Sequence, residues 1–369
     1  MWLRDSTPTS ATLQERVDAA TGPVLAMTRA AMEQAKTSLG VAVVGLGVGE
    51  QHALAYSRLP NCRIERLYDL DPAKTTAIEA RLGVGKQAES FQAILDDPAV
   101  DVVSIATYDD MHFDQVRSAL LAGKHVFVEK PLCRTVAELR EIKKTWRRCG
   151  HPKLVCNLPL RAAPIYGWLK RTIGEGRLGR IYAFDGDYLY GRLHKITDGW
   201  RSEVENYSVM IGGGVHIIDL MLWLTGELPK RVATVGNRIA SEGTGFGYED
   251  FMASTFVFPS GLIGRVTANF GCVHRHHHVV RVFGTKATFI YDDAGPRLHR
   301  SRDEADRAEP VDLPTLPADK GVLIPEFVEA IVTGADGRKA TQREFDVISV
   351  CAAADRALAT GESVEVEFV

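Results

Sequence analysis

The sequence predicts an α/β protein in which a doubly wound parallel sheet is followed by an α/β domain built on an open, largely antiparallel sheet. Two observations predict this fold. Short apolar runs alternate with helical stretches from Gly40 to about residue 157, and longer strand-like segments follow. The length of 369 residues agrees with two domains, since a domain usually takes roughly 100–200 residues.

The composition excludes several classes of protein. The chain has 44 Lys and Arg against 47 Asp and Glu, a formal charge of −3, and so lacks the basic surplus of nucleic-acid-binding proteins. Hydrophobic residues make up 45%, enough to bury a core. No apolar stretch reaches the ~20 residues that span a bilayer, so we expect no membrane segment. Scattered cysteines without a C-x-x-C pair, and a polar N-terminus, favour a cytoplasmic protein with reduced thiols.

Three segments are expected along the chain. Residues 1–39 have apolar positions at helical spacing and predict a helical extension that packs on its own or a neighbouring subunit. Residues 40–157 form the first domain, where strand and helix alternate at a pace typical of right-handed crossovers. Its strands are expected at 41–44, 64–68, 100–106, 125–128 and 154–156, and its helices at 51–59, after Asp71-Pro72, at 111–121 and at 136–148.

The second domain is expected over residues 158–369. Turn signals at 259–261 and 284–285 separate the later strand-like segments and favour antiparallel pairing. Strands are expected at 181–190, 232–237, 251–258, 262–270, 278–291 and 364–368, and helices at 164–172, 215–224, 325–333 and 344–359. The charged, Pro-containing stretch 298–320 is expected to be a loop.

A glycine-rich turn directly follows the first strand. Gly45, Gly47, Val48 and Gly49 lie between that strand and a helix, where backbone N–H groups and the helix N-terminus can hold a pyrophosphate. The alternative is a tight turn without a ligand. Glu50 occupies the usual position of a third glycine, which leaves open how closely the helix packs.

Asp69 ends the second strand, about 20 residues beyond the turn. A carboxylate at this place can accept hydrogen bonds from the ribose 2′-hydroxyl of NAD. It would repel a 2′-phosphate, so NAD is favoured over NADP.

Two further motifs, with the glycine turn, make the chain resemble the oxidoreductase family named for glucose–fructose oxidoreductase, inositol dehydrogenase and MocA (Gfo/Idh/MocA). They are AGKHVFVEKPL at 122–132 and GGGVHIID at 212–219, and the resemblance extends from about Gly40 to the C-terminus. It implies a nicotinamide-dependent redox site between a Rossmann domain and an open-sheet domain. It also implies sugars, cyclitols and related polyols as substrates, and self-association through the open sheet as a dimer or tetramer.

Lys130 and Glu129 end a predicted parallel strand, the edge where open α/β sheets bind ligands. Partial desolvation and the positive nicotinamide ring should lower the pKa of Lys130, so that it can orient or deprotonate a hydroxyl. The resemblance implies a cis Lys130–Pro131 bond. The alternative for Lys130 is a surface lysine before a turn.

His216 is the stronger candidate for proton transfer, because imidazole titrates near neutral pH and the glycines before it permit close approach. Asp219 follows one helical turn later, where it could orient His216 or reach the substrate. Many members of the family carry Asp at the position of Gly212, so Lys130 or Tyr207 would take over part of its work. The alternative is a histidine satisfied in the core.

Other site residues follow from the resemblance. Thr107, Tyr108 and His112 stand where relatives contact the nicotinamide ribose, and segments facing the substrate contain Arg161, Tyr190, Trp200, Arg201 and Tyr207.

The run His274–His278 resembles a metal site at first sight. In a strand, however, His276 and His278 share one face while His277 points away, and no acidic or thiol ligand joins them nearby, so we expect no metal. Contact with an anionic substrate, or exposure, is the favoured interpretation. Arg275 and Arg281 would suit the phosphate of a sugar nucleotide.

The sequence thus predicts an NAD-dependent dehydrogenase that transfers a hydride between the nicotinamide and a secondary carbinol of a sugar, sugar nucleotide or cyclitol. His216 would act as general acid and base, and Lys130 would polarise the hydroxyl. Two alternatives stay open. One is a glycoside hydrolase or lyase that oxidises its substrate transiently, and the other is a catalytically silent NAD-binding protein.

Overall fold

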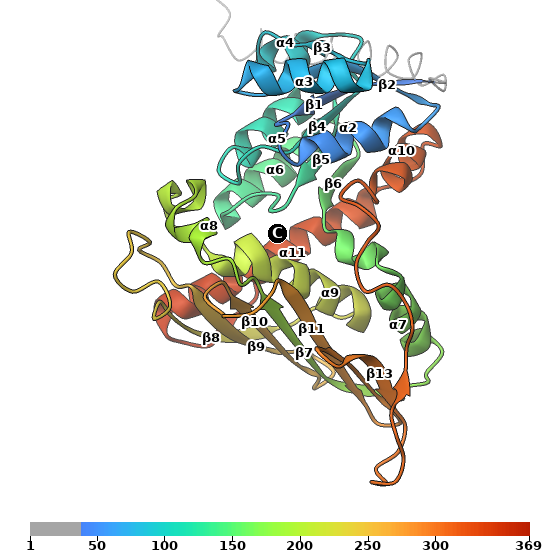
Figure 1. The fold of residues 1–369 in the computed structure, drawn as a ribbon, viewed down its shortest axis with the longest axis vertical. Coiled ribbons are helices and arrows are strands. Elements are labelled where there is room, and N and C mark those ends of the chain that lie inside the picture. Colours follow the sequence, from blue (N-terminus) through green and yellow to red (C-terminus); the bar gives the residue numbers. More distant parts are fainter. Residues whose placement is uncertain (1–37) are drawn as a thin grey trace, which may run out of the picture.

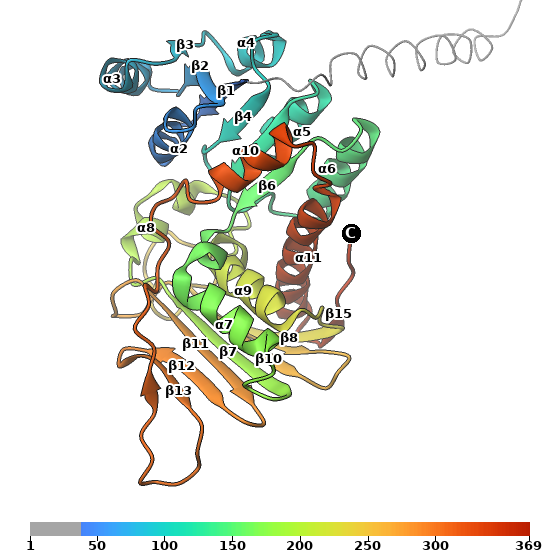
Figure 2. The same ribbon diagram turned by 90° about the vertical axis from the view of Figure 1, so that its right-hand side faces the viewer.

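The computed structural model describes residues 38–369, so the predicted helical extension lies almost wholly outside the described residues. Two sheets form the body of the protein, the smaller at the top of Figure 1 and the larger at the bottom. The long helix α11 (Arg338–Thr360) runs from the level of the first sheet to the helix-covered face of the second (Figure 2). None of the helices in residues 38–369 is long and apolar enough to cross a membrane.

The first sheet has six parallel strands in the order β3-β2-β1-β4-β5-β6. They are β1 (Leu39–Val44), β2 (Cys62–Tyr68), β3 (Lys86–Gln87), β4 (Val102–Ile105), β5 (His125–Glu129) and β6 (Leu154–Asn157). Every residue of β1 and β4 is buried, as expected for parallel strands covered on both faces. The strand order reverses between β1 and β4, which is where open α/β sheets bind ligands.

Five helices connect these strands: α2 (Gly49–Ser57), α3 (Pro72–Leu82), α4 (Phe91–Asp96), α5 (His112–Leu121) and α6 (Val136–Arg148). Asp71 caps α3 by accepting from the Ala73 N–H, and a capping box of Thr135 and Glu138 starts α6. The short elements β3 and α4 were not predicted, because too few residues are present to show a hydrophobic period.

The second sheet, as described within residues 38–369, has nine strands in the order β14-β13-β12-β11-β7-β10-β9-β8-β15, and within this sheet only the β7–β10 pair is parallel. They are β7 (Ile181–Leu189), β8 (Arg231–Asn237), β9 (Phe251–Val257), β10 (Ile263–Asn269), β11 (His277–Gly284), β12 (Thr288–Asp292), β13 (Gly295–His299), β14 (Glu309–Pro310) and β15 (Val364–Glu365). The largely antiparallel sheet is thus confirmed.

Two predictions for this sheet were wrong. The stretch expected as a loop contains β14 and the end of β13, since a short edge pair needs backbone hydrogen bonds rather than apolar alternation. The segment 278–291 forms a hairpin of β11 and β12 instead of one strand.

The helices of the second part are η1 (Pro159–Ala162), α7 (Pro164–Gly174), α8 (His194–Thr197), η2 (Trp200–Glu203), the π-helix η3 (Met210–Gly214), α9 (Val215–Thr225) and α10 (Ile324–Val332). Helices α7, α9 and α11 cover one face of the nine-stranded sheet, and no helix of residues 38–369 covers the other (Figures 1 and 2). Helix α10 returns to the first sheet and packs Phe327 near Phe127 of β5. Because α10 belongs to the predicted second domain but packs on the first sheet, the domain boundary after Asn157 stays a prediction.

Candidate active site at the domain junction

The glycine turn after β1 has the backbone that a dinucleotide site requires. Gly45 adopts φ +82°, and a Cβ there would lie 2.5 Å from the carbonyl oxygen of Ala106, so only glycine fits. A Cβ on Gly47 would meet nothing within 4 Å, and Val48, just before α2, is exposed. The turn is therefore open on its outer side, next to the N-terminus of a helix.

Gly49 allows the close packing of α2 on β1 that Glu50, at the usual position of the third glycine, left open. A Cβ on Gly49 would lie 3.1 Å from Val43 Cγ1 and 3.3 Å from the Cβ of Ala106, so Gly49 itself allows α2 to pack closely on β1. Glu50 points away and forms an ion pair with Arg81 at 2.6 Å. The third glycine role is thus filled one residue earlier than usual.

Asp69 lies beside this turn as predicted. Its Oδ2 accepts from the Leu46 N–H at 2.6 Å, and its Oδ1 accepts from the Asp71 N–H at 2.9 Å and from Lys74 Nζ at 3.4 Å. Burial raises the pKa of this carboxyl, but the backbone donors and Lys74 outweigh burial and hold the pKa below its usual value. Asp69 is therefore ionised at neutral pH and held in place at the turn. These residues fit the adenosine half of NAD.

The three residues predicted after β4 lie in different surroundings. His112 is fully buried, and its ring nitrogens lie 2.6 Å from the carbonyl oxygen of Pro131 and 3.3 Å from that of Thr107. It thus ties the end of β4 to the turn after β5. Tyr108 is 47% exposed and stacks on Trp200 with ring centroids 4.8 Å apart. This contact joins the two halves of the molecule.

Lys130 reaches across the junction. The Lys130–Pro131 peptide bond is cis, as predicted, and Lys130 Nζ donates to the carbonyl oxygen of Gly212 at 2.9 Å. Gly212 lies in the π-helix η3, and single π-turns inside helices are frequent at functional sites. An ammonium group from the first sheet is thereby placed at the start of α9.

Glu129 is held within the first domain. Its Oε1 lies 3.3 Å from His52 Nε2 and accepts from Asn157 Nδ2 at 2.7 Å. Burial opposes ionisation of Glu129, yet these partners and Lys130 lower its pKa to about 2. His52 was not predicted as a site residue, because it lies on α2 with no motif around it.

His216 lies on the first turn of α9 and stacks on Tyr188 with ring centroids 5.9 Å apart. Its Nδ1 is buried and has no hydrogen-bond partner within residues 38–369. Burial, and then the positive charge of Lys130, hold its pKa well below the usual value. His216 was predicted to titrate near neutral pH, and the structure corrects this, because burial and Lys130 keep its imidazole neutral there.

Asp219 does not orient His216 as expected. Arg161 Nε donates to both carboxylate oxygens of Asp219, at 2.9 and 2.8 Å, and Arg161 also lies 3.6 Å from Glu344 of α11. Three residues on a helix are offset by about 60°, enough to turn Asp219 toward η1 and α11 while His216 faces the sheet. Arg161, expected on the substrate side, is 15% exposed and belongs to this buried ion cluster.

Tyr207 fills the space beside Gly212. A Cβ on Gly212 would clash with Tyr207 Oη, so no side chain fits at position 212 while Tyr207 is in place. Burial and then Asp109 raise the pKa of Tyr207, while Arg201 opposes them, so its hydroxyl stays protonated. The guanidinium carbon of Arg201 in turn lies 4.3 Å from the ring centroid of Trp200.

The histidine run divides between two faces, as strand alternation predicted. His276 and His278 approach Tyr188, with ring centroids 5.2 and 5.4 Å away, and Tyr190 lies 5.4 Å from His276. His277 instead contacts Tyr291 at 4.9 Å. No group of His, Cys, Asp or Glu in the described part of the chain has an arrangement that could hold a metal ion.

The two arginines proposed for a phosphate already have carboxylate partners. Arg275 pairs with Asp293 and Arg281 with Asp187, each at 3.2 Å. Neither is arranged to hold a phosphate.

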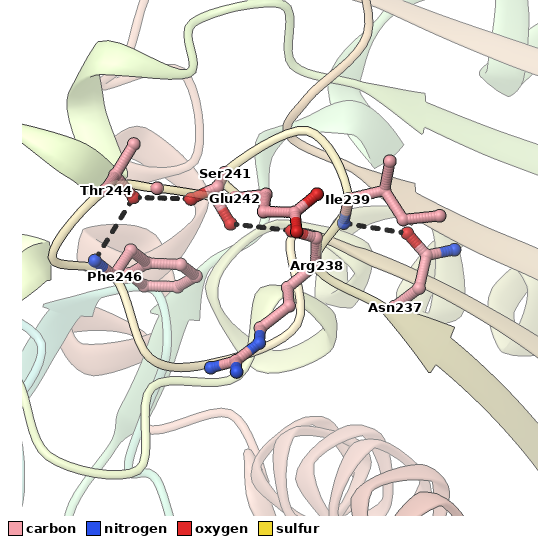
Figure 3. Close-up of a pocket in the computed structure, with 8 residues that line it drawn as sticks. Asn237, Arg238, Ile239, Ser241, Glu242, Thr244 and Phe246 are labelled. Atoms are coloured by element: carbon pink, nitrogen blue, oxygen red, sulfur yellow. Dashed lines mark hydrogen bonds between the residues drawn. The ribbon is translucent and has the colours of Figure 1, made fainter.

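A pocket is formed by the loop between β8 and β9 (Figure 3). Hydrogen bonds within the loop hold its conformation, and in one of them Thr244 Oγ1 donates to the Ser241 carbonyl oxygen at 2.7 Å. Phe246, which lines it, meets Tyr207 edge-on at 6.1 Å. The loop thus supports Tyr207, while the pocket is lined by none of the predicted site residues.

Comparison with known proteins places these features in a family. A family model described as "Oxidoreductase family, NAD-binding Rossmann fold" matches residues 39–155, and a "GFO/IDH/MocA C-terminal domain" model matches residues 166–290. Levoglucosan dehydrogenase of Pseudarthrobacter phenanthrenivorans is 26% identical over 69% of this chain and 74% of its own. A 1,5-anhydro-D-fructose reductase of Ensifer adhaerens is 33% identical over 50% of this chain and 54% of its own.

The fold agrees with solved structures. Levoglucosan dehydrogenase in complex with NADH superposes with a TM-score of 0.79 over 90% of this chain and 100% of that chain, at 22% identity. At that identity the likeness shows the shared fold.

Proposed function

We propose, because the chain belongs to the Gfo/Idh/MocA family of NAD-binding oxidoreductases, that it oxidises a secondary hydroxyl of a sugar or cyclitol, or reduces the corresponding ketone. The names of its relatives support this substrate class, since they include levoglucosan dehydrogenase and scyllo-inositol 2-dehydrogenase (NAD(+)). The observation that carries the proposal is the meeting of Lys130, His216 and the Gly212 carbonyl at the domain junction.

The first domain would hold the cofactor. The open turn at Gly47 and the N-terminus of α2 suit the pyrophosphate, and the ionised Asp69 suits the ribose hydroxyls and disfavours a 2′-phosphate. When bound, NAD accepts or supplies the hydride.

The second step is proton transfer by this chain's own groups. His216 is neutral at pH 7 because its pKa is depressed by burial and by Lys130, so one of its ring nitrogens can accept the proton of a substrate hydroxyl. The ammonium group of Lys130 can donate a hydrogen bond to the same oxygen and stabilise the negative charge that develops on it. In the reductive direction the protonated imidazole would return the proton.

The test is NAD reduction with a panel of sugars and cyclitols, followed by absorbance of the reduced cofactor. Reduced cofactor in equal amount to oxidised product supports the proposal. Product without net reduced cofactor would indicate a hydrolase or lyase that oxidises transiently, and NAD binding without any turnover would indicate a silent binding protein. His216→Asn should lower turnover by about 10²–10⁴-fold with little change in NADH affinity.

Two expectations remain part of this proposal. The helix-free face of the nine-stranded sheet exposes Val235 (69%) and Ile263 (40%), which supports self-association through this face as a dimer or tetramer. Cys62, Cys133, Cys156, Cys272 and Cys351 are free thiols, which supports the expected cytoplasmic location. Sedimentation analysis of the full chain tests the first expectation.

A further inference from the structure

Three imidazoles gather around Tyr188 on the helix-covered face of the second sheet. His216 comes from α9, His278 from β11, and His276 from the turn just before it. The rings of His276 and His278 lie 4.8 Å apart, and that of His216 lies 6.2 Å from that of His278. We call these three residues the histidine cluster.

The charged groups facing the cluster are cations. Lys320, in the loop before α10, is close enough to lower the pKa of all three histidines, Lys130 acts on His216, and Arg192 acts on His276. Protonation of His277, the neighbour on the strand, would also lower the pKa of His276 and His278.

Carboxylates do not balance these charges. Within residues 38–369, no carboxylate forms a hydrogen bond or ion pair with any member of the cluster. The nearby Glu129 is bound by His52 and Asn157. Asp109, whose Oδ2 is buried without a partner among the described residues, acts on Tyr188, Arg201 and Tyr207 and on none of the three histidines.

Two nitrogen atoms in the cluster are buried and lack a partner in the described part of the chain: His216 Nδ1 and His278 Nε2. His278 is only 7% exposed, so water does not readily compensate for the missing hydrogen bond. Buried polar groups of this kind usually serve a ligand or an ordered water. Burial and the neighbouring histidines and Lys320 hold the pKa of His278 at about 3, and burial with Arg192 and Lys320 holds that of His276 at about 4.

We propose, building on the dehydrogenase function above, that the substrate is a sugar acid whose carboxylate binds at His276, His278 and Lys320 while its reacting hydroxyl lies between Lys130 and His216. An anion is the ligand that a region of uncompensated positive charge favours. A carboxylate suits this place better than a phosphate, because tight phosphate recognition commonly uses arginine forks and Arg275 and Arg281 are committed to Asp293 and Asp187.

The site also predicts proton uptake. The bound carboxylate would favour the charged form of His276 or His278, so their pKa values would rise and a proton would be taken from solution when the acid binds near neutral pH. A neutral sugar gives no such uptake. Calorimetry in two buffers of different ionisation enthalpy measures this difference on the NADH-loaded enzyme, without turnover.

The experiment compares matched pairs: glucose with glucuronate, galactose with galacturonate, and a hexose 6-phosphate as the phosphate probe. We expect kcat/KM for the acid to exceed that for the neutral sugar by at least about tenfold, with proton uptake on acid binding. Equal values for acid and neutral sugar, no measurable acid binding, or a tenfold preference for the phosphate would each overturn the proposal. Loss of NAD reduction with every compound while the acid still binds with proton uptake would instead overturn the dehydrogenase function alone.

Variants identify the residues responsible. Lys320→Met removes an exposed cation and should reduce the acid-to-neutral ratio by about tenfold, whereas the matched Arg275→Met, an exposed cation paired with Asp293, should leave the ratio as in the wild type. His276→Asn should likewise reduce the ratio, and His277→Asn, on the opposite face of the strand, should not. A ratio unaffected by both Lys320→Met and His276→Asn would overturn the assignment.

Discussion

The two sides of the domain junction differ in how their polar groups are satisfied. On the first-domain side, the carboxylates of Asp69 and Glu129 have protein partners, although Asp109 Oδ2 and Asn157 Oδ1 are buried without one among residues 38–369. On the second-domain side, His216 Nδ1 and His278 Nε2 are buried without a partner among residues 38–369. The carboxylates of Asp69 and Glu129 are thus held in place in advance, whereas the imidazoles of His216 and His278 offer nitrogen atoms that a substrate can satisfy. This difference suggests that the first side serves one fixed cofactor and that the second side sets specificity.

The largest effect should come from the group that joins both sides. Lys130→Ala removes the ammonium group that contacts Gly212, and we expect turnover to fall by about 10³-fold because the developing charge on the substrate oxygen loses its donor. NADH affinity, measured by fluorescence titration, should stay close to wild type. Lys86→Met, on the exposed edge strand β3, is the control. Unchanged turnover in Lys130→Ala would remove Lys130 from the mechanism.

A change confined to the first side should affect cofactor binding alone. Asp69→Ala removes the acceptor of the Leu46 N–H and the carboxylate expected at the ribose, so we expect the Kd for NADH to rise by about 10–100-fold. The discrimination against NADPH should shrink, while kcat at saturating NAD changes little. Asp71→Asn, which keeps a capping side chain on α3, should leave both affinities intact. If the Kd for NADH rises in Asp71→Asn but not in Asp69→Ala, Asp69 is not the residue that holds the cofactor.

A smaller effect should follow from filling the space next to Tyr207. Gly212→Ala places a Cβ against Tyr207 Oη, and overpacking of this kind lowers the free energy of unfolding by about 1–3 kcal/mol. Turnover should also fall, since the carbonyl that accepts from Lys130 must move. Gly247→Ala, where a Cβ meets nothing within 4 Å, is the matched control for chemical denaturation. Equal free energies of unfolding for the two variants would show that Tyr207 can move aside without destabilising the protein.

The smallest effect concerns Asp355, which is hydrogen-bonded to Ser208 at the start of η3. Ser208 Oγ donates to Asp355 Oδ1 at 2.7 Å and accepts from the Ile211 N–H at the start of η3. Burial raises the pKa of Asp355 from 3.8 to about 7, so the folded state binds a proton that the unfolded state has released. Its contribution to the free energy of unfolding is therefore complete below about pH 4 and is lost as pH rises toward 7.

Asp355→Asn should flatten this fall in stability between about pH 4 and 7, measured by denaturant unfolding at several pH values. Asp336→Asn is the control, because Arg338 holds the pKa of exposed Asp336 below its usual value and outside this window. Glu344, whose pKa burial raises to about 7, should leave a residual slope in the variant. A slope identical to wild type would show that Asp355 does not supply the proton.

Prediction from sequence succeeded where function depends on neighbours along the chain. The predicted helix at residues 136–148 has those bounds in the structure, because its capping box and periodicity are both local. The glycine turn and Asp69 were likewise found, since a strand, a turn and a helix in sequence bring them together. How closely the first helix packs was left open, because no sequence pattern shows that Gly49 provides the close approach to Val43 and Ala106.

Prediction failed where the partners of a side chain lie far away in the sequence. The spacing of three residues on α9 suggested that Asp219 orients His216, but the guanidinium of Arg161 from η1, which also pairs with Glu344 of α11, binds Asp219 instead. The contact between His52 and Glu129 also joins elements with no shared motif.

The sequence by itself predicted the α/β alternation and the strand–turn–helix at Gly45, and it identified Lys130 and His216 as candidate site residues, because each depends on residue type and local order. Only the tertiary structure decided that Lys130 reaches Gly212, that Tyr207 occupies the space beside it, and that His276 and His278 join His216. The reason is physical: backbone patterns follow from local steric and hydrogen-bonding rules, whereas contacts between two sheets depend on packing over the whole chain.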